Sequence, residues 1–157
     1  MQLISSSFQH GGEIPAYYTS DGKDVSPALS WGDAPAETRS FALIVHDPDA
    51  PRPGGFTHWT VYNIPPETDH IDENVPHNEV VSGFGTQGKN DAGKVGYMGP
   101  APPSGTHRYL FRLYALNATL ALSAGATPKE VNDAMKGHVI AHGELMGTYQ
   151  NKHERAA

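Results

Sequence analysis

The chain has 157 residues, no cysteine and a formal net charge of −6, from 11 basic and 17 acidic side chains. The length suits one domain over 1–157, and without cysteine neither disulfides nor thiol chemistry is available. The acidic balance disfavours nucleic acid or an anionic membrane surface as the main partner, because both require basic patches.

Glycine and proline, with 17 and 13 residues respectively, are spread along the whole sequence. They separate short apolar segments, which is the pattern of an all-β domain with long loops. The N-terminus lacks the basic start and apolar stretch of a secretory signal, and the longest apolar run, residues 41–45, is too short to span a membrane. We therefore expect a cytoplasmic protein.

Short strands are expected first at residues 3–8, 13–18 and 26–31. Two stronger strands follow at 39–46 and 56–64, separated by Asp-Pro-Asp-Ala-Pro, whose prolines cannot continue a ladder. A short strand is expected at 80–84, and a loop rich in glycine and proline fills 85–106. The third strong strand is predicted at 107–116.

One helix is predicted after this last strand. Thr127, Pro128 and Glu130 form the pattern of a capped helix start. Apolar residues continue at helical spacing, so the helix is expected to run from 128 to about 142. A final edge strand is expected at 148–149, and residues after 152 are expected to fray.

Polar side chains gather at the ends of the three strong strands. His107 and Tyr109 share the more apolar face of their strand, because side chains alternate faces. By the same alternation His58 shares a face with Phe56, Thr60 and Tyr62. Asp47 lies just past the end of the strand at 39–46. If neighbouring strands are antiparallel, these side chains converge at one end of a sheet.

Such a group suits an anion. Imidazole and phenol groups can donate hydrogen bonds, and a glycine-rich loop can bring backbone N–H groups close to an oxyanion. The alternative is structural: a histidine in an apolar strand is more often a packed core residue, and Asp-Pro-Asp-Ala-Pro can be only a turn. The pattern alone leaves both interpretations open.

The other histidines carry weaker signals. His10, His70, His77 and His153 lie in polar segments, and His46 ends a buried strand. His138 and His142 have the i, i+4 spacing of helical metal ligands, but two ligands are too few and the catalytic Glu of zinc proteases is missing. No phosphate-binding loop or nucleophile elbow occurs. We therefore predict no metal and no cofactor.

The sequence resembles the phosphatidylethanolamine-binding protein family, also called the Raf kinase inhibitor protein family. It is most similar to the short prokaryotic YbhB/YbcL-like branch. The resemblance covers nearly the whole chain and is carried by four segments: SPALSW at 26–31, DPDAP at 47–51, FTHWTVYNIP at 56–65, and GPAPP at 99–103 leading to HRY at 107–109.

The resemblance implies a β sandwich of two antiparallel sheets with one or two peripheral helices and an anion pocket at one end of the main sheet. Asp49 is expected to brace the loop rather than touch the ligand. Animal members carry a C-terminal helix that helps to close the pocket; this sequence shows no such segment, so a more open pocket, or one covered in a homodimer, is expected. The ligand-binding residues it implies are Asp47, His58, Gly99, Pro103, His107 and Tyr109.

These features favour a non-enzymatic binding protein for phosphate or phosphorylethanolamine-like headgroups, with modulation of a partner kinase or protease as a further expectation from the family. The alternative is a hydrolase in which Asp47 and a histidine activate water on a small ester or phosphoester. Neither nucleic-acid binding nor stable membrane insertion is expected.

Overall fold

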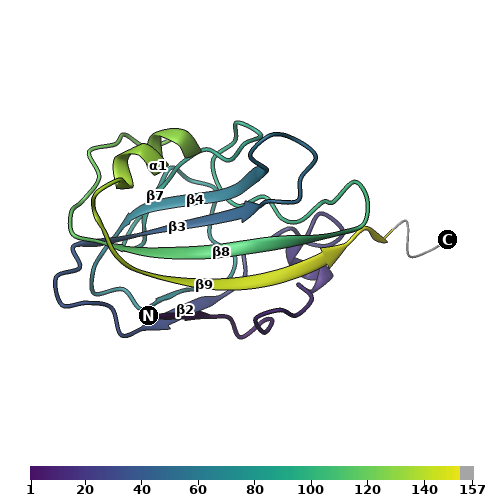
Figure 1. The fold of residues 1–157 in the computed structure, drawn as a ribbon, viewed down its shortest axis with the longest axis horizontal. Helices are drawn as coiled ribbons and strands as arrows, with labels where there is room; N and C mark the ends of the chain where they lie inside the picture. The colour runs from purple at the N-terminus through teal and green to yellow at the C-terminus, as the bar shows by residue number, and fades with distance from the viewer. Residues whose placement is uncertain (153–157) are drawn as a thin grey trace.

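A six-stranded antiparallel sheet dominates the computed structural model, which describes residues 1–152 (Figure 1). A smaller sheet contains β1 (Gln2–Ile4), β2 (Leu29–Gly32) and β5 (His70–Ile71) in the order β1-β2-β5. The large sheet has the order β6-β7-β4-β3-β8-β9 and contains β3 (Ser40–Asp47), β4 (Phe56–Ile64), β6 (Val80–Val81), β7 (Gly85–Gln87), β8 (Thr106–Leu116) and β9 (Val139–Gln150).

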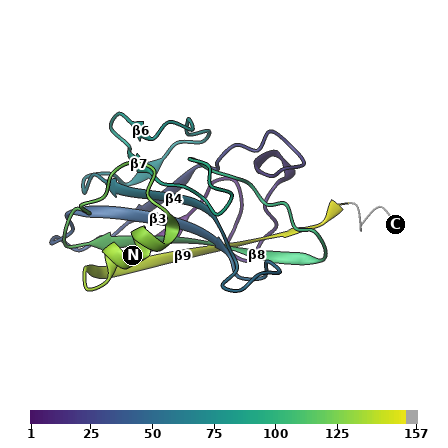
Figure 2. The same ribbon diagram turned by 90° about the horizontal axis from the view of Figure 1, so that it is seen from above.

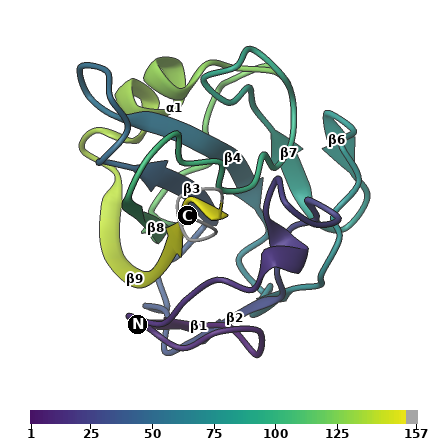
Figure 3. The same ribbon diagram turned by 90° about the vertical axis from the view of Figure 1, so that its right-hand side faces the viewer.

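The two faces of the large sheet are covered differently. Figure 3 shows the small sheet on one face and the helix α1 (Pro128–Met135) on the other. A main core lies between the sheets and includes Leu3, Trp31, Leu43, Trp59 and Phe111. A second core beneath α1 joins Tyr62 and Leu116 to Val131 and Met135 of the helix. The prediction of a mainly β fold with two antiparallel sheets is confirmed.

The three strong strands form where the sequence predicts them. The β3 strand is buried along almost its whole length, and it pairs antiparallel with β4 on one side and β8 on the other. Figure 2 shows the edges of the sheet, with the β6–β7 hairpin on one side and β9 on the other. Because β3 is central, its C-terminal end lies beside the starts of both neighbouring strands.

The predicted length of the helix is wrong. The helix starts as expected, with Thr127 and Glu130 in a reciprocal capping box, but it ends at Met135. Gly137 then adopts a left-handed conformation with φ 82°, which stops the helix. The chain continues as β9, a 12-residue strand that pairs along β8 and buries alternate residues toward its end. Residues 148–149 are therefore the end of a long strand.

Smaller departures concern short segments. Residues 16–18 form a 3-10 helix (η1, Ala16–Tyr18) instead of part of a strand, and the short strands β5 and β7 were not predicted. His153 and the expected frayed end lie outside the described residues. No helix within 1–152 has the length and apolar character needed to cross a membrane.

Candidate ligand-binding site

One end of the large sheet gathers the chemistry-bearing side chains. Asp47 is the last residue of β3, Phe56 opens β4, and His107 is the second residue of β8. These strands are adjacent and antiparallel, so the three positions meet at the end to which the β3 arrow points in Figure 1. The loop between β3 and β4 and the loop before β8 surround this end.

A β-bulge aims His58 toward this group. His46 pairs with Thr57 and Val45 pairs with Trp59, so two residues of β3 face three of β4 and His58 is the extra residue. A bulge interrupts strict alternation and redirects a side chain. His58 therefore lies against Tyr109, with ring centroids 5.3 Å apart, while Tyr62 packs under α1. The prediction that His58 shares a face with Tyr62 is wrong for this reason.

Asp47 and His107 form a buried pair. The Nδ1 atom of His107 lies 2.6 Å from Oδ2 of Asp47, and the two residues are 6% and 3% exposed. The other carboxylate oxygen of Asp47 accepts a hydrogen bond from the backbone N–H of Asp49 at 2.8 Å. A carboxylate accepts hydrogen bonds, so Nδ1 carries the ring hydrogen and Nε2 is the nitrogen left for a ligand.

His58 is oriented by a backbone carbonyl in a similar way. Its Nδ1 atom lies 2.6 Å from the carbonyl oxygen of Met98, while the Met98 N–H donates to the His58 carbonyl at 3.1 Å. This double contact fixes the loop before β8 to the bulge in β4. Burial is the main cause that lowers the pKa of His58, so its ring is neutral near pH 7.

Tyr109 contributes a hydroxyl. The group is buried beside the Ala101 backbone but has hydrogen-bond geometry with no described residue. Burial, together with the negative charge of Asp47, raises the pKa of Tyr109 well above its ordinary value. The phenol therefore keeps its proton and is available as a donor.

These side chains line a cavity of about 220 Å³. Its wall is mainly apolar, and Arg52 supplies a permanent positive charge, with its guanidinium 5.5 Å from the centre of the Phe56 ring. The sequence interpretation missed Arg52, although it lies one residue after Asp-Pro-Asp-Ala-Pro. The lining residues are Asp47, Ala50, Pro51, Arg52, Phe56, His58, Met98, Ala101, Pro102, Pro103, His107 and Tyr109.

Five of the six residues predicted for the site therefore meet at this cavity, and Gly99 does not. The Gly99 N–H donates to Asp24 at 2.7 Å, away from the lining. A Cβ atom at Gly99 would lie 2.4 Å from both that carboxylate and the Tyr18 carbonyl oxygen. Gly99 thus allows the loop to pack closely against the N-terminal segment.

Asp49 holds the loop between β3 and β4. Its carboxylate accepts from the side chain of Arg108 at 3.0 and 2.9 Å and from the Arg108 backbone N–H at 2.8 Å. The hydrogen bonds from Arg108 are the main cause that lowers the pKa of Asp49 to about 2. The expected bracing role agrees with this position, since Asp49 ties the Asp47 loop to the start of β8.

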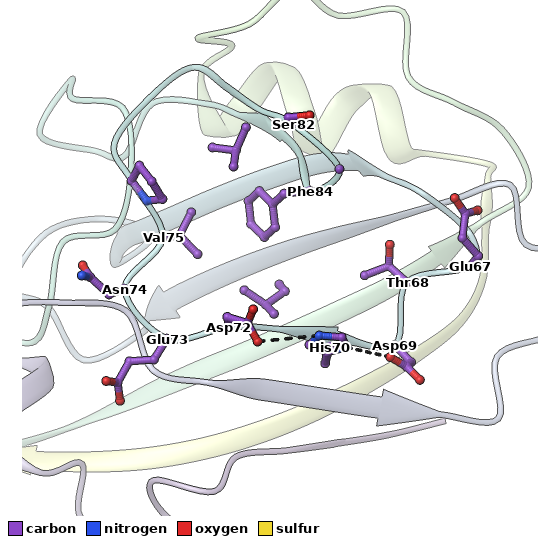
Figure 4. Close-up of a pocket in the computed structure, with 14 residues that line it drawn as sticks. Glu67, Thr68, Asp69, His70, Asp72, Glu73, Asn74, Val75, Ser82 and Phe84 are labelled. Atoms are coloured by element: carbon purple, nitrogen blue, oxygen red, sulfur yellow. Dashed lines mark hydrogen bonds and ion pairs between the residues drawn. The ribbon is translucent and has the colours of Figure 1, made fainter.

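A larger hollow of about 450 Å³ lies between residues 67–76 and 81–84 (Figure 4). Its carboxylates are exposed, and His70 lies between Asp69 and Asp72 at 2.8 and 3.6 Å. The hydrogen bond with Asp69 is the main cause that raises the pKa of His70. Because no buried polar side chain lines this hollow, the cavity beside Asp47 is the better candidate site.

The i, i+4 histidine pair does not lie on a helix, so the helical spacing of metal ligands is not realised. His138 lies after the helix and its Nδ1 atom contacts Asn117 at 2.9 Å, while His142 is exposed on β9. Within residues 1–152, no group of three or more histidine, aspartate or glutamate side chains is arranged to hold a metal ion.

Comparison with known proteins agrees with this fold over nearly the whole chain. The family model for phosphatidylethanolamine-binding protein matches residues 4–150. The chain belongs to the phosphatidylethanolamine-binding protein family. One similar protein is a UPF0098 protein of Methanothermobacter thermautotrophicus, which is 48% identical over 96% of this chain and 99% of its own length.

Solved structures of the phosphatidylethanolamine-binding protein family superpose closely on this chain. The homologue CT736 from Chlamydia trachomatis has a TM-score of 0.87 and 42% identity, covering 96% of this chain and 97% of its own. Escherichia coli YbcL has a TM-score of 0.88 and 30% identity, covering 95% and 97%.

Proposed function

We propose that this member of the phosphatidylethanolamine-binding protein family is a non-enzymatic binding protein for small anions, with phosphate and phosphorylethanolamine-like headgroups as the ligand class. One observation carries the proposal: two buried imidazoles, of His58 and His107, have Nδ1 engaged by the protein and line the same cavity. Each ring therefore has one nitrogen left for a ligand. Arg52 supplies positive charge, and Tyr109 supplies a hydroxyl donor.

The composition of the wall favours binding over covalent catalysis. The side chains that line the cavity include no serine, threonine or lysine that could attack a bound ester. Prolines and other apolar side chains make up most of the remaining wall, which is typical of a preformed ligand site with a few placed polar groups.

Calorimetry with inorganic phosphate and with phosphorylethanolamine tests this proposal. We expect His107→Ala to weaken binding at least about fivefold, because it removes one ligand-facing nitrogen and leaves Asp47 buried without its partner. His142→Ala is the matched control, since that histidine is exposed on β9. If His107→Ala binds both compounds as the unmodified protein does, the assignment of the cavity is overturned.

One observation supports a second candidate function, ester hydrolysis. The Asp47–His107 pair has the geometry in which a carboxylate orients an imidazole that acts as a general base on water. A panel of small phosphate and carboxylate esters tests this alternative. Turnover that disappears in both His58→Ala and His107→Ala would favour the hydrolase over the binding protein.

Modulation of a partner kinase or protease stays a prediction of the family resemblance. Pull-down with the unmodified protein and with His107→Ala tests this prediction. A partner that recognises the occupied cavity should be recovered only with the unmodified protein.

A further inference from the structure

The hydrogen bonds of His58 determine which of its nitrogens can accept a proton. The Met98 carbonyl can only accept, so the contact of 2.6 Å requires hydrogen on Nδ1. Turning the ring over would place a carbon against that oxygen and lose the bond. In the neutral ring the remaining nitrogen, Nε2, therefore carries a lone pair.

The surroundings of the ring favour this neutral state. His58 is 5% exposed, and burial outweighs the attraction of nearby carboxylates in setting its pKa below the ordinary value. The charged and titratable groups that face it come from four parts of the chain: Asp24 in the N-terminal loop, His46 and Asp47 on β3, Arg52 in the following loop, and His107 and Tyr109 on β8.

His107 imposes a second constraint of the same kind. Its Nδ1 hydrogen is directed at Asp47, so its Nε2 atom is also an acceptor while the ring is neutral. A fully deprotonated phosphate in the cavity would then face lone pairs on both histidines. A phosphate that carries a proton avoids this repulsion between lone pairs at one of the two histidines. Its P–O–H group donates to the imidazole nitrogen there, while its other oxygens face Arg52 and Tyr109.

We propose that His58 acts in the cavity as a hydrogen-bond acceptor, so that the site selects phosphomonoesters in the form that carries one proton and discriminates against phosphodiesters. A phosphodiester has a negative charge but no P–O–H group to donate to Nε2 of His58. The inference rests on the proposed anion-binding function and narrows its ligand class to free phosphomonoesters, because a headgroup that is still esterified in a phospholipid is a phosphodiester.

Calorimetry with phosphorylethanolamine, a monoester, and glycerophosphorylethanolamine, a diester with the same ammonium group, tests the inference. At pH 7.5 we expect the monoester to bind at least about tenfold more tightly and to take up about one proton, because this pH lies above its second pKa of about 6. Repeating the titration in buffers with different heats of ionisation measures that uptake. The monoester affinity should fall about tenfold per pH unit above pH 7.

His58→Gln separates proton acceptance from the size of the diester. The glutamine amide can donate to an anion without a proton from the ligand, so the preference for the monoester should shrink to within about threefold and the proton uptake should disappear. His58→Asn is the second variant, since its amide can keep the contact with Met98 while removing Nε2. His142→Gln is the control and should behave as the unmodified protein.

The outcomes separate the inference from the function on which it rests. Binding of neither compound at any pH from 5.5 to 8 overturns the proposed function itself. Binding of the monoester without proton uptake, or equally tight binding of the diester, overturns the inference and leaves the anion site in place.

Discussion

At the scale of single residues, the candidate site depends on which atoms the protein uses to hold each histidine. Asp47 and the Met98 carbonyl each take an Nδ1 atom, which leaves Nε2 as the chemically available nitrogen of both rings. That both histidines lie near the end of a strand could be predicted from the sequence. The tautomers could not, because they depend on contacts between residues 40 and 60 positions apart.

Arg52 supplies the positive charge in the cavity lining, and we expect it to strengthen anion binding. Arg52→Gln removes this charge from a solvent-exposed position, so phosphate affinity should fall about three- to tenfold at low salt. The loss should shrink as salt concentration rises, because screening weakens the lost interaction. Calorimetry at two salt concentrations measures both effects.

The matched control is Arg112→Gln, since Arg112 pairs with Glu144 and does not line the cavity. Equal phosphate affinity in Arg52→Gln and the unmodified protein at low salt would contradict a role for Arg52 in binding.

At the scale of elements, the central strand and its loop position the site. The loop after β3 returns through Gly55, where φ is 76° and a Cβ atom would lie 2.4 Å from the Asp47 carbonyl oxygen. The bulge in β4 then turns His58 toward Tyr109. Neither feature follows from apolar periodicity, since a bulge breaks the alternation on which the strand prediction depends.

The ion pair between Asp49 and Arg108 gives this loop a pH-dependent stability. The pKa of Asp49 is lowered to about 2 in the folded protein, so the pair stabilises the fold above pH 4 and is lost as pH falls through about 2. Because the pair is largely exposed to solvent, we expect its contribution to be small.

Denaturant unfolding of the unmodified protein and of Asp49→Asn at pH 6 and at pH 2 measures this contribution. The difference in unfolding free energy between the two proteins should be present at pH 6 and diminish at pH 2. A difference that is constant over this range would contradict the role of ionised Asp49.

The helix shows where local signals are sufficient and where they fail. The capping box of Thr127 and Glu130 is a local feature, and the start of α1 was predicted correctly. Its end was not, because the apolar residues after Gly137 also suit a strand, and the pairing with β8 decides in favour of β9. Val139, which extended the helical spacing, is in fact exposed, as is its neighbour Ile140.

At the scale of the whole molecule, the large sheet lies between the candidate site and the core beneath α1. The cavity involves Tyr109, which belongs to the core between the sheets, whereas the core under α1 is built on the opposite face. The two-layer arrangement was predicted from the family resemblance, since composition and strand number alone indicate only an all-β domain.

This separation predicts that stability and binding respond independently to changes under the helix. Val131→Ala truncates a fully buried side chain beneath α1 and should lower the unfolding free energy by about 2 kcal/mol. Phosphate affinity at 25 °C should stay within about twofold of the unmodified value. Denaturant unfolding and calorimetry on the same sample measure both, and a parallel loss of affinity would contradict the separation.

We propose above that His58 and His107 bind an anion through their Nε2 atoms. Nitrogen-15 NMR of the histidine rings during a phosphate titration near pH 7 observes these atoms themselves. We expect the Nε2 signals of His58 and His107 to shift to saturation while Nδ1 of His58 stays protonated and exposed His142 is unchanged. Saturating phosphate that leaves His58 and His107 unshifted, or shifts His142 equally, would contradict this mode of binding.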